Sequence, residues 1–264
     1  MIDLQNIALQ KVALAKEVAI YIKSESKGIS ADKVEIKGLH DFVTHVDKHA
    51  EIKLVKGLQR ILPDAGFITE ENTLSNRKHY TWVVDPLDGT TNFIHSVPCF
   101  CISIALLCED EVVVGVIHEI NLKESFYAWK GSKAYLNGKE IAVSVASRLE
   151  DALLVTGFPN RDYSRLDEYM ELFRYFMENT HGVRRFGSAA ADLAYVACGR
   201  CEGFYEYGLS PWDVAAGALI VECAGGKVTD FNGGDNYIFG EDIIAGNSAF
   251  FPDFLLAVKK YLSK

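Results

Sequence analysis

The stretch that most constrains the fold is an apolar, β-prone run that ends in a cluster of acids and turn residues. Residues 80–84 (Tyr-Thr-Trp-Val-Val) predict a buried strand, and Asp-Pro-Leu-Asp-Gly follows at 85–89. Because Pro86 cannot donate to a sheet ladder, we expect the strand to stop there. The next residues, Thr-Thr-Asn at 90–92, are good helix starters, which predicts free backbone N–H groups facing the two carboxylates.

Hard oxygen ligands beside such a helix start are typical of a site for Mg²⁺ and phosphate. Asp85 and Asp88 offer carboxylates, and the Leu87 carbonyl lies between them. Gly89 removes a side chain where the backbone must approach a ligand closely. A lone Asp-x-x-Asp-Gly stretch is more often an ordinary turn with solvated acids. Three further acidic blocks in the chain favour the metal site.

Together the four blocks resemble the signature of the inositol monophosphatase family of Mg²⁺-dependent, Li⁺-sensitive phosphatases. The similarity covers nearly the whole chain and keeps the family's order. The resemblance implies a layered αβαβα sandwich, in which residues 1–147 form an α+β half with an antiparallel sheet and most metal ligands. Residues 148–264 would form an α/β half, and a homodimer is expected. The blocks are residues 41–47, 70–71, 85–92 and 212–217, the last running on to 224–226.

The acids of these blocks predict a pair of Mg²⁺ ions. Glu70, Asp85 and the Leu87 carbonyl would hold the first ion, and Asp85, Asp88 and Asp213 would hold the second. The resemblance also allows a third, weaker ion near Glu70. Only one of the adjacent glutamates at 70–71 can face a shared pocket, because successive strand residues point to opposite sides, and the family pattern makes that one Glu70.

Two acids also have structural explanations. Thr44 and Asp47 have capping-box spacing, so Asp47 can simply cap a helix. The resemblance implies that Asp41 and Asp47 help Thr90 hold a water, and one residue can fill both roles. By spacing alone Asp213 is a capping acid in a first helical turn, and only the match to the family pattern makes it a metal ligand.

We hypothesise hydrolysis of a phosphate monoester by a metal-activated water that Glu70 and the Thr90 hydroxyl orient and deprotonate. Thr90 is a positioning group, since no Lys, His or amine neighbours it in sequence to activate it as a nucleophile. The N–H groups of Gly89 and Thr90 would bind phosphate oxygens. Glu206, on a strand among tyrosines, can alternatively face solvent. The resemblance implies substrate contacts from Asp88, Ser188, the Ala189 backbone, Glu206 and Asp213.

The most similar branch of the family acts on inositol 1-phosphate. Thr-Asn-Phe at 91–93 fits that branch, whereas relatives that act on 3′-phosphoadenosine nucleotides carry Lys-Glu-Phe. Ser210 stands where animal inositol monophosphatases carry His, which weakens the argument for this substrate. Alternative substrates are another sugar phosphate, fructose 1,6-bisphosphate, histidinol phosphate or a nucleotide 3′-phosphate. A non-catalytic regulatory or RNA-associated protein of the same fold is the alternative from another class.

Composition limits the partners. A net charge of −9 argues against a nucleic-acid-binding surface, and bound divalent cations would let so acidic a protein accept a phosphate. The opening residues do not predict a signal peptide, no stretch is apolar enough to span a bilayer, and the 6 Cys suggest reduced thiols, so we expect a cytoplasmic protein. The lone C-x-x-C at Cys198 and Cys201 fits buried thiols better than a redox pair or half a zinc site.

Overall fold

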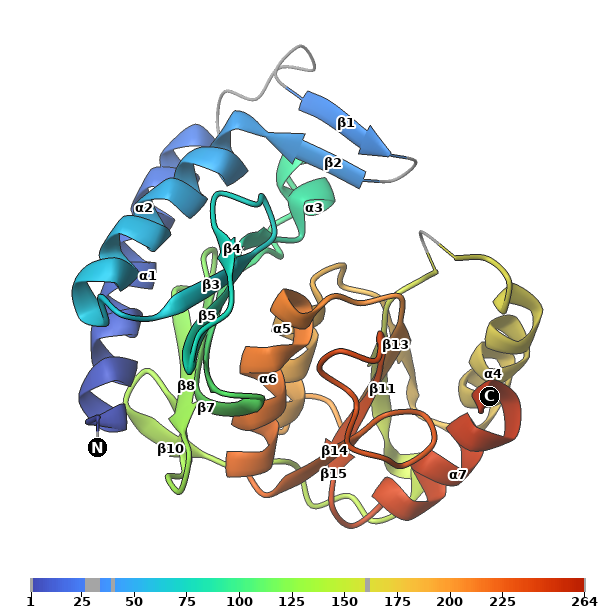
Figure 1. Ribbon diagram of the computed structural model, residues 1–264. Coiled ribbons are helices and arrows are strands. Elements are labelled where there is room, and N and C mark those ends of the chain that lie inside the picture. The colour runs from blue at the N-terminus through green and yellow to red at the C-terminus, as the bar shows by residue number, and fades with distance from the viewer. Residues whose placement is uncertain (1, 27–33, 39–40, 160–161, 264) are drawn as a thin grey trace.

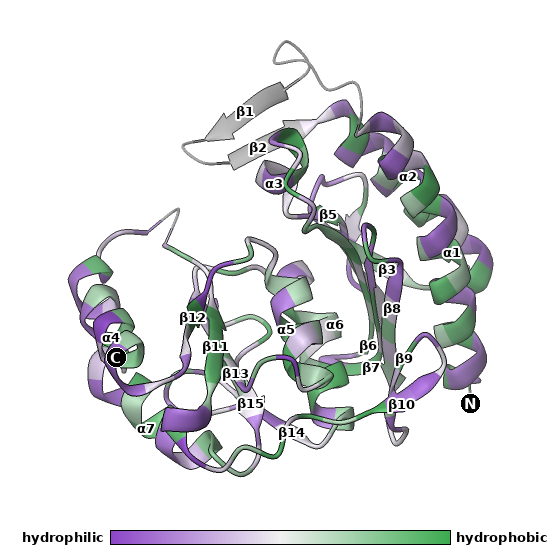
Figure 2. Ribbon diagram, turned by 180° about the vertical axis from the view of Figure 1, so that it is seen from behind, coloured by the Kyte–Doolittle hydropathy of each residue, from purple (hydrophilic) through white to green (hydrophobic). Residues whose placement is uncertain are grey.

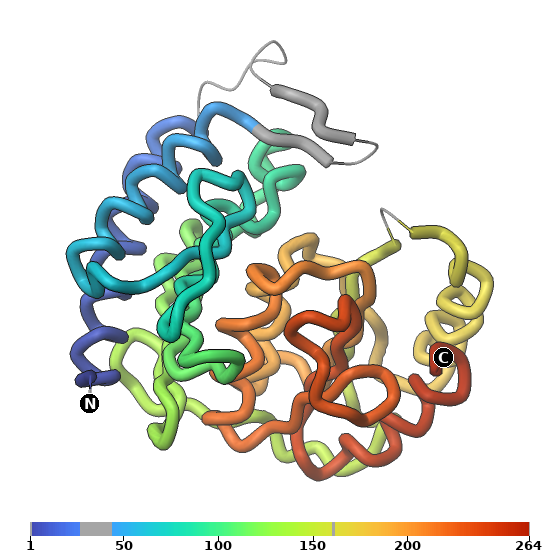
Figure 3. Tube along the Cα trace, viewed as in Figure 1, coloured from blue at the N-terminus to red at the C-terminus, as the bar shows by residue number. Residues whose placement is uncertain are grey.

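A computed structural model describes residues 2–26, 34–38, 41–159 and 162–263 (Figure 1; the chain is traced in Figure 3). Side chains are described for residues 2–26, 44–159 and 162–263. Helices and sheets alternate in five layers, which confirms the predicted αβαβα sandwich. Helices pair in the outer layers and between the two sheets. The pairs are α1 (Leu4–Glu25) with α2 (His45–Ile61), α5 (Ala189–Ala197) with α6 (Pro211–Cys223), and α4 (Leu166–Asn179) with α7 (Phe251–Leu262).

The large sheet is mainly antiparallel, as predicted, and consists of a meander with two strands added at one edge. Its order is β10-β9-β8-β7-β6-β5-β3-β4, antiparallel except between β3 and β5. The Asn137-Gly138 turn joins β9 and β10 in a hairpin. The strands are β3 (Gly66–Thr69), β4 (Ser75–Asn76), β5 (Tyr80–Asp88), β6 (Cys101–Cys108), β7 (Glu111–Glu119), β8 (Glu124–Trp129), β9 (Ala134–Leu136) and β10 (Lys139–Ile141).

The small sheet has the order β12-β11-β13-β15-β14. Its first three strands are parallel, and β15 runs antiparallel to both of its neighbours. Because the sheets use separate parts of the chain, the predicted division after residue 147 is compatible with the architecture and stays a prediction. The strands are β11 (Leu153–Thr156), β12 (Gly182–Arg184), β13 (Gly203–Tyr207), β14 (Gly226–Thr229) and β15 (Asp242–Asn247), and β1 (Val34–Gly38) pairs separately with β2 (Asp41–Thr44).

The central helices are apolar because both of their faces are covered. Buried side chains on α5 and α6 form one core with the facing sides of both sheets. Figure 2 shows the contrast with α1 and α4, where polar and apolar residues alternate around helices that meet a sheet on one side only. None of the described helices combines the length and the apolar character needed to cross a membrane.

One local prediction is wrong, because β5 does not end at Pro86. Asp85 pairs with Ser103 on β6 and Asp88 pairs with Cys101, so the two residues between the aspartates oppose a single residue of β6. A bulged residue does not need to donate to the ladder, so proline, which has no backbone N–H, is tolerated at position 86. The strand therefore continues to Asp88. The bulge leaves both aspartates at the end of a central strand.

Lys11 on α1 is buried in the core between that helix and the large sheet. Its ammonium donates to the Val114 carbonyl over 3.2 Å and lies 5.2 Å from the centre of the Trp82 ring. Burial lowers the pKa of Lys11 well below its usual value. Since the unfolded chain then binds more protons between the folded and unfolded pKa values, Lys11 makes the free energy of unfolding rise with pH across that window.

We therefore expect Lys11→Met to stabilise the protein at pH 7 by about 1–3 kcal/mol, because a side chain of similar length then fills the site without an ammonium to desolvate. Urea unfolding at pH 7 and pH 9 measures the effect. The gain from the substitution should be smaller at pH 9 than at pH 7. A methionine variant that is less stable than the parent at pH 7 would contradict this account of Lys11.

Candidate active site

One pocket collects residues from three of the predicted acidic blocks and from the second half of the chain. It lies where β3 and β5 end and where α3 (Thr90–Ile94), α5 and α6 begin. Ten of the predicted site residues line it, and Asp47 lies behind them. They are Glu70, Asp85, Leu87, Asp88, Gly89, Thr90, Ser188, Ala189, Glu206 and Asp213.

Carboxylates converge in this pocket. Oxygen atoms of Asp85, Asp88 and Asp213 lie within 4.8 Å of one another. Burial raises the pKa of Asp85 well above its usual value, and the nearby charges of Glu70 and Asp88 raise it further. Burial and the charge of Asp213 also raise the pKa of Glu70 well above its usual value. Glu70 Oε2 is enclosed and has no hydrogen-bond partner among the described residues. Mutually repelling oxygen donors, one of them unpaired, fit a divalent cation.

The start of α5 orients Asp88. Its Oδ2 accepts hydrogen bonds from the Ser188 hydroxyl and the Ala190 N–H, both over 2.7 Å. Burial raises the pKa of Asp88 to about 6, and these two bonds act against the rise. Because both bonds reach the same oxygen, Oδ1 is the Asp88 atom available to a ligand in the pocket.

The start of α6 is docked beside the end of β5 through Ser103. Ser103 pairs with Asp85 across the sheet, and its hydroxyl donates to the Trp212 carbonyl over 3.0 Å. Asp213 follows directly, and its Oδ2 accepts from the Ser210 N–H over 2.7 Å, which confirms the predicted cap. Asp213 therefore caps α6 and also belongs to the acidic cluster.

Asp47 links α2 to the pocket through Thr90. The Thr90 hydroxyl lies 2.9 Å from Asp47 Oδ1 and 3.0 Å from the Leu87 carbonyl oxygen. Asp47 Oδ2 accepts from the N–H and the hydroxyl of Thr44, at 2.9 and 2.5 Å, so the predicted capping box is present as well. Asp47 thus makes both sets of contacts expected of it. The side chain of Asp41 lies outside the part of the chain that the structure describes, and its role stays a prediction.

Gly89 forms the turn between β5 and α3 with φ 94° and ψ 34°, a left-handed conformation that favours glycine. A Cβ there would lie 3.0 Å from the Cys99 carbonyl oxygen and 3.2 Å from that of Gly187. The turn brings the backbone of Gly89 and Thr90 to the pocket wall, where the sequence predicts phosphate-binding N–H groups. Asn92 ties this turn to the second half, since its Nδ2 donates to the carbonyls of Cys99 and Phe186, each over 2.7 Å.

Sequence reasoning missed several residues that line the pocket, among them Gly157, Arg185 and Asp192. Arg185 is exposed at the rim, whereas Asp192 is buried. Asp192 is the one charged residue in the helical sequence AAADLAYVA, and a charge in so apolar a segment is the signal that could have drawn attention to it. Gly157 and Arg185 carry no such signal.

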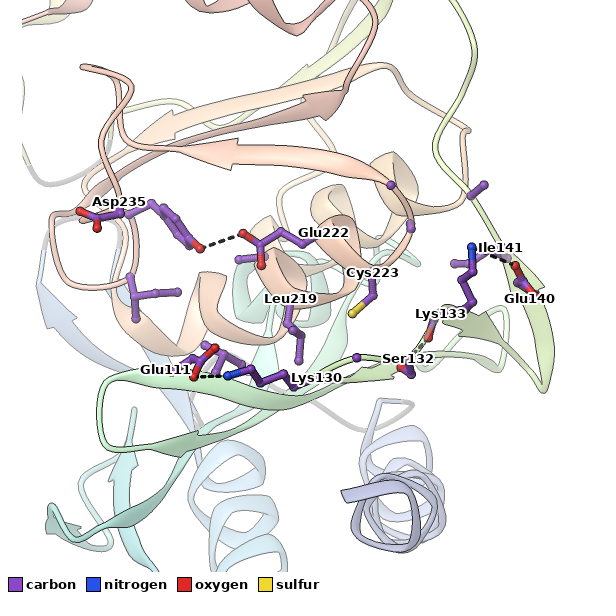
Figure 4. A pocket seen from close by; sticks show the side chains of 18 of the residues that line it. Glu111, Lys130, Ser132, Lys133, Glu140, Ile141, Leu219, Glu222, Cys223 and Asp235 are labelled. Atoms are coloured by element: carbon purple, nitrogen blue, oxygen red, sulfur yellow. Dashed lines mark hydrogen bonds and ion pairs between the residues drawn. The ribbon is translucent and has the colours of Figure 1, made fainter. Parts of the chain in front are cut away.

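The six cysteines, all within the described residues, are free, which agrees with the expected thiols, and Cys201 of the C-x-x-C pair is buried. A second pocket lies at the opposite end of α6 and holds none of the predicted site residues (Figure 4). Its charges are largely satisfied internally. Lys130 pairs with Glu111 over 2.6 Å, and the Tyr237 hydroxyl donates to Glu222 over 3.0 Å.

The crowded acids predict that Mg²⁺ stabilises the protein. Repulsion among them destabilises the metal-free fold, and an ion at one hundred times its dissociation constant adds about 2.7 kcal/mol, or roughly 5–10 °C in melting temperature. We expect Asp213→Asn to lose most of the rise in melting temperature that Mg²⁺ gives the parent. Without metal, the variant should melt above the metal-free parent, because one repelling charge is gone and asparagine can keep the hydrogen bond from the Ser210 N–H. Thermal melts with Mg²⁺ or EDTA measure both effects, with Glu222→Gln as the control outside the pocket. An equal Mg²⁺ shift in parent and Asp213→Asn would contradict this assignment.

Comparison with known proteins agrees with the geometry. The model of the inositol monophosphatase family matches residues 3–261. The chain is 41% identical over 263 residues to the Nus factor SuhB of Pseudomonas aeruginosa, covering 97% of this chain and 96% of that protein. It is 40% identical over 233 residues to the inositol-1-monophosphatase of Mesorhizobium japonicum, covering 88% of each.

Solved structures show the same architecture along the whole chain. The extragenic suppressor protein suhB of Bartonella henselae superimposes with a TM-score of 0.90 at 39% identity, covering 97% of this chain and 98% of that one. The IMPase of Thermotoga maritima superimposes with a TM-score of 0.87 at 33% identity, covering 95% and 96%. The four acidic blocks, the layered fold and these matches agree, and this chain belongs to the inositol monophosphatase family.

Proposed function

We propose that this protein is a Mg²⁺-dependent phosphate monoester hydrolase whose preferred substrate is inositol 1-phosphate. The observation that carries the proposal is the convergence of Asp85, Asp88 and Asp213 within 4.8 Å, with Glu70 in the same pocket. The substrate is inferred from Thr-Asn-Phe at 91–93 and from the relative named inositol-1-monophosphatase.

In this proposal Glu70, Asp85 and the Leu87 carbonyl hold one Mg²⁺, and Asp85, Asp88 and Asp213 hold another. Bound there, the ions would supply a water activated for attack and stabilise charge on the leaving oxygen. The donors are hard oxygens throughout, as Mg²⁺ prefers, and the orphaned Glu70 Oε2 gains a partner.

The remaining groups act on the water and the ester. With its proton directed to Asp47 or the Leu87 carbonyl, the Thr90 hydroxyl oxygen can accept a hydrogen bond from the attacking water, and Glu70 takes the water's proton. The N–H groups of Gly89 and Thr90 hold the phosphate oxygens in a preorganised arrangement. Ser188, the Ala189 backbone, Glu206 and Asp213 face the alcohol part of the ester.

A regulatory role is the second candidate. Relatives at 41% and 40% identity, from Pseudomonas aeruginosa and Escherichia coli, are named Nus factor SuhB. Such a role does not require clustered, buried carboxylates, which raise one another's pKa and are costly to keep. Their presence favours turnover in this chain. Homodimer formation, lithium inhibition, a cytoplasmic location and a third Mg²⁺ remain predictions from the family and the composition.

Phosphate release from a panel of esters tests the proposal. The panel contains inositol 1-phosphate, fructose 1,6-bisphosphate, histidinol phosphate, a 3′-phosphoadenosine nucleotide and p-nitrophenyl phosphate, each with Mg²⁺, with EDTA, and with Mg²⁺ plus Li⁺. We expect Mg²⁺-dependent release that is fastest from inositol 1-phosphate and falls with Li⁺. A different preferred ester would correct the substrate. The absence of release from every ester with Mg²⁺ would favour the regulatory role.

A further inference from the structure

Asp192 is a buried acid of the pocket that the reaction, as proposed above, does not use. It lies one helical turn after Ser188 on α5, is 1% exposed, and lines the pocket. Its Oδ1 accepts no hydrogen bond from any residue that the structure describes. A carboxyl oxygen that is kept from water without a hydrogen-bond partner destabilises the fold, so its presence needs an explanation.

The helix itself does not supply that explanation. The helix macrodipole favours an acid in the first turn, but this gain is smaller than the cost of an unpaired, buried carboxyl oxygen. The Ser188 hydroxyl already caps α5, accepting from the Ala191 N–H over 3.4 Å. An apolar residue at position 192 would match the rest of this helix better than aspartate does.

The charges around Asp192 do not pair with it either. Burial is the largest cause that raises the pKa of Asp192, and the charges of Glu206 and Asp88 raise it further, while Arg185 acts in the opposite direction. Arg185 lies at the exposed rim, with its guanidinium 5.5 Å from the centre of the Phe158 ring. Because Asp192 lines the pocket, a molecule bound there can supply the missing hydrogen-bond donor.

Glu206 provides a second carboxyl group in the same pocket. A Cβ on Gly157 would lie 1.9 Å from Glu206 Oε1 and 2.2 Å from Oε2, so the carboxyl group rests directly against the Gly157 backbone. Glycine at position 157 thus allows Glu206 to occupy this place. Asp192 and Glu206 both line the pocket, and the charge of Glu206 acts on the pKa of Asp192, so the pocket has two carboxylate acceptors near each other.

We propose that Asp192 is a specificity-determining residue, which accepts a hydrogen bond from a hydroxyl of the substrate's alcohol part next to the hydroxyl that meets Glu206. The inference rests on the proposed hydrolase function and extends it to a residue with no assigned role. Two neighbouring acceptors suit an alcohol with adjacent hydroxyls. An ester that lacks hydroxyls gains nothing from them, which makes the role measurable.

The test compares two esters in the same variant. For Asp192→Ala we expect KM for inositol 1-phosphate to rise about ten- to hundredfold, as is typical when a hydrogen bond to a charged group is lost. KM for p-nitrophenyl phosphate, which has no hydroxyl, should stay within about twofold of the parent value. Asp192→Asn keeps one oxygen acceptor and should lie between the parent and the alanine variant. Glu222→Ala changes an exposed acid of α6 outside this pocket in the same way, and as the control it should leave both values unchanged.

The outcomes separate the two proposals. Equal changes for both esters in Asp192→Ala and Asp192→Asn would show a structural role and overturn the inference, while the hydrolase function would stand. If Asp192→Ala fails to fold, the same comparison in Asp192→Asn decides the matter, because its shape is conserved. If the unaltered protein releases phosphate from neither ester with Mg²⁺, the proposed function fails and the inference fails with it.

Discussion

Asp88→Asn is expected to lower kcat by about a thousandfold or more, equivalent to about 4 kcal/mol of transition-state stabilisation, while the fold stays intact. Oδ2 of Asp88 is held by the Ser188 hydroxyl and the Ala190 N–H. The amide oxygen of asparagine can accept both bonds. The amide nitrogen must then occupy the place of Oδ1, where it presents hydrogens to the cation instead of a ligand oxygen.

Steady-state phosphate release at saturating Mg²⁺ measures this effect, and a thermal melt in EDTA checks the fold. Glu222→Gln is the matched control, an acid-to-amide change on α6 outside the catalytic pocket, and should keep parent activity. The metal-free Asp88→Asn variant should melt at or above the parent temperature, because one repelling charge is gone. Near-normal turnover of Asp88→Asn would show that the ligand assignment is wrong.

Thr90→Val is expected to lower kcat by about a hundredfold, and Thr90→Ser to restore most of the activity. The Thr90 hydroxyl links Asp47 on α2 to the Leu87 carbonyl at the end of β5, at 2.9 and 3.0 Å. Valine has the same shape but can neither hold a water nor donate a hydrogen bond to Asp47, whereas serine can do both. Loss of one positioned proton-transfer group is typically worth about 10²–10⁴ in rate.

Separate measurement of kcat and KM distinguishes a role of Thr90 in positioning the water from a role in binding the substrate. Valine should lower kcat with little change in KM for inositol 1-phosphate, since the substrate's hydroxyls meet other residues. Thr91→Val, which changes the neighbouring exposed threonine in the same way, is the control and should alter kcat by less than about tenfold. A serine variant as impaired as the valine variant would contradict a role for the hydroxyl.

The parts of the structure that short-range rules govern could be predicted from the sequence. The capping boxes at Thr44 and Ser210 depend on residues three positions apart, and both are present. The apolar run at residues 80–84 likewise predicted a strand, which lies within β5. Bringing these parts together in one pocket rested on the family resemblance, because Thr90 and Asp47 are 43 positions apart and no local rule connects them.

The errors and omissions also have physical reasons. Pro86 was expected to end β5, but the ladder opposes two residues of β5 to one of β6 and needs no N–H at that point. Sheet register depends on both strands, so reading one strand alone could not reveal the bulge. Asp192 and Gly157 escaped notice because their surroundings come from α5, β13 and the end of β11, which only the folded chain brings together.

A crystal grown with Mn²⁺ and inorganic phosphate, and measured at the manganese absorption edge, tests the central claim most directly. The account predicts anomalous density between the carboxylates of Asp85, Asp88 and Asp213, with a further peak beside Glu70 and the Leu87 carbonyl. It also predicts phosphate against the backbone of Gly89 and Thr90. A fully loaded crystal with no manganese among these carboxylates, or with manganese bound only elsewhere, would contradict the account.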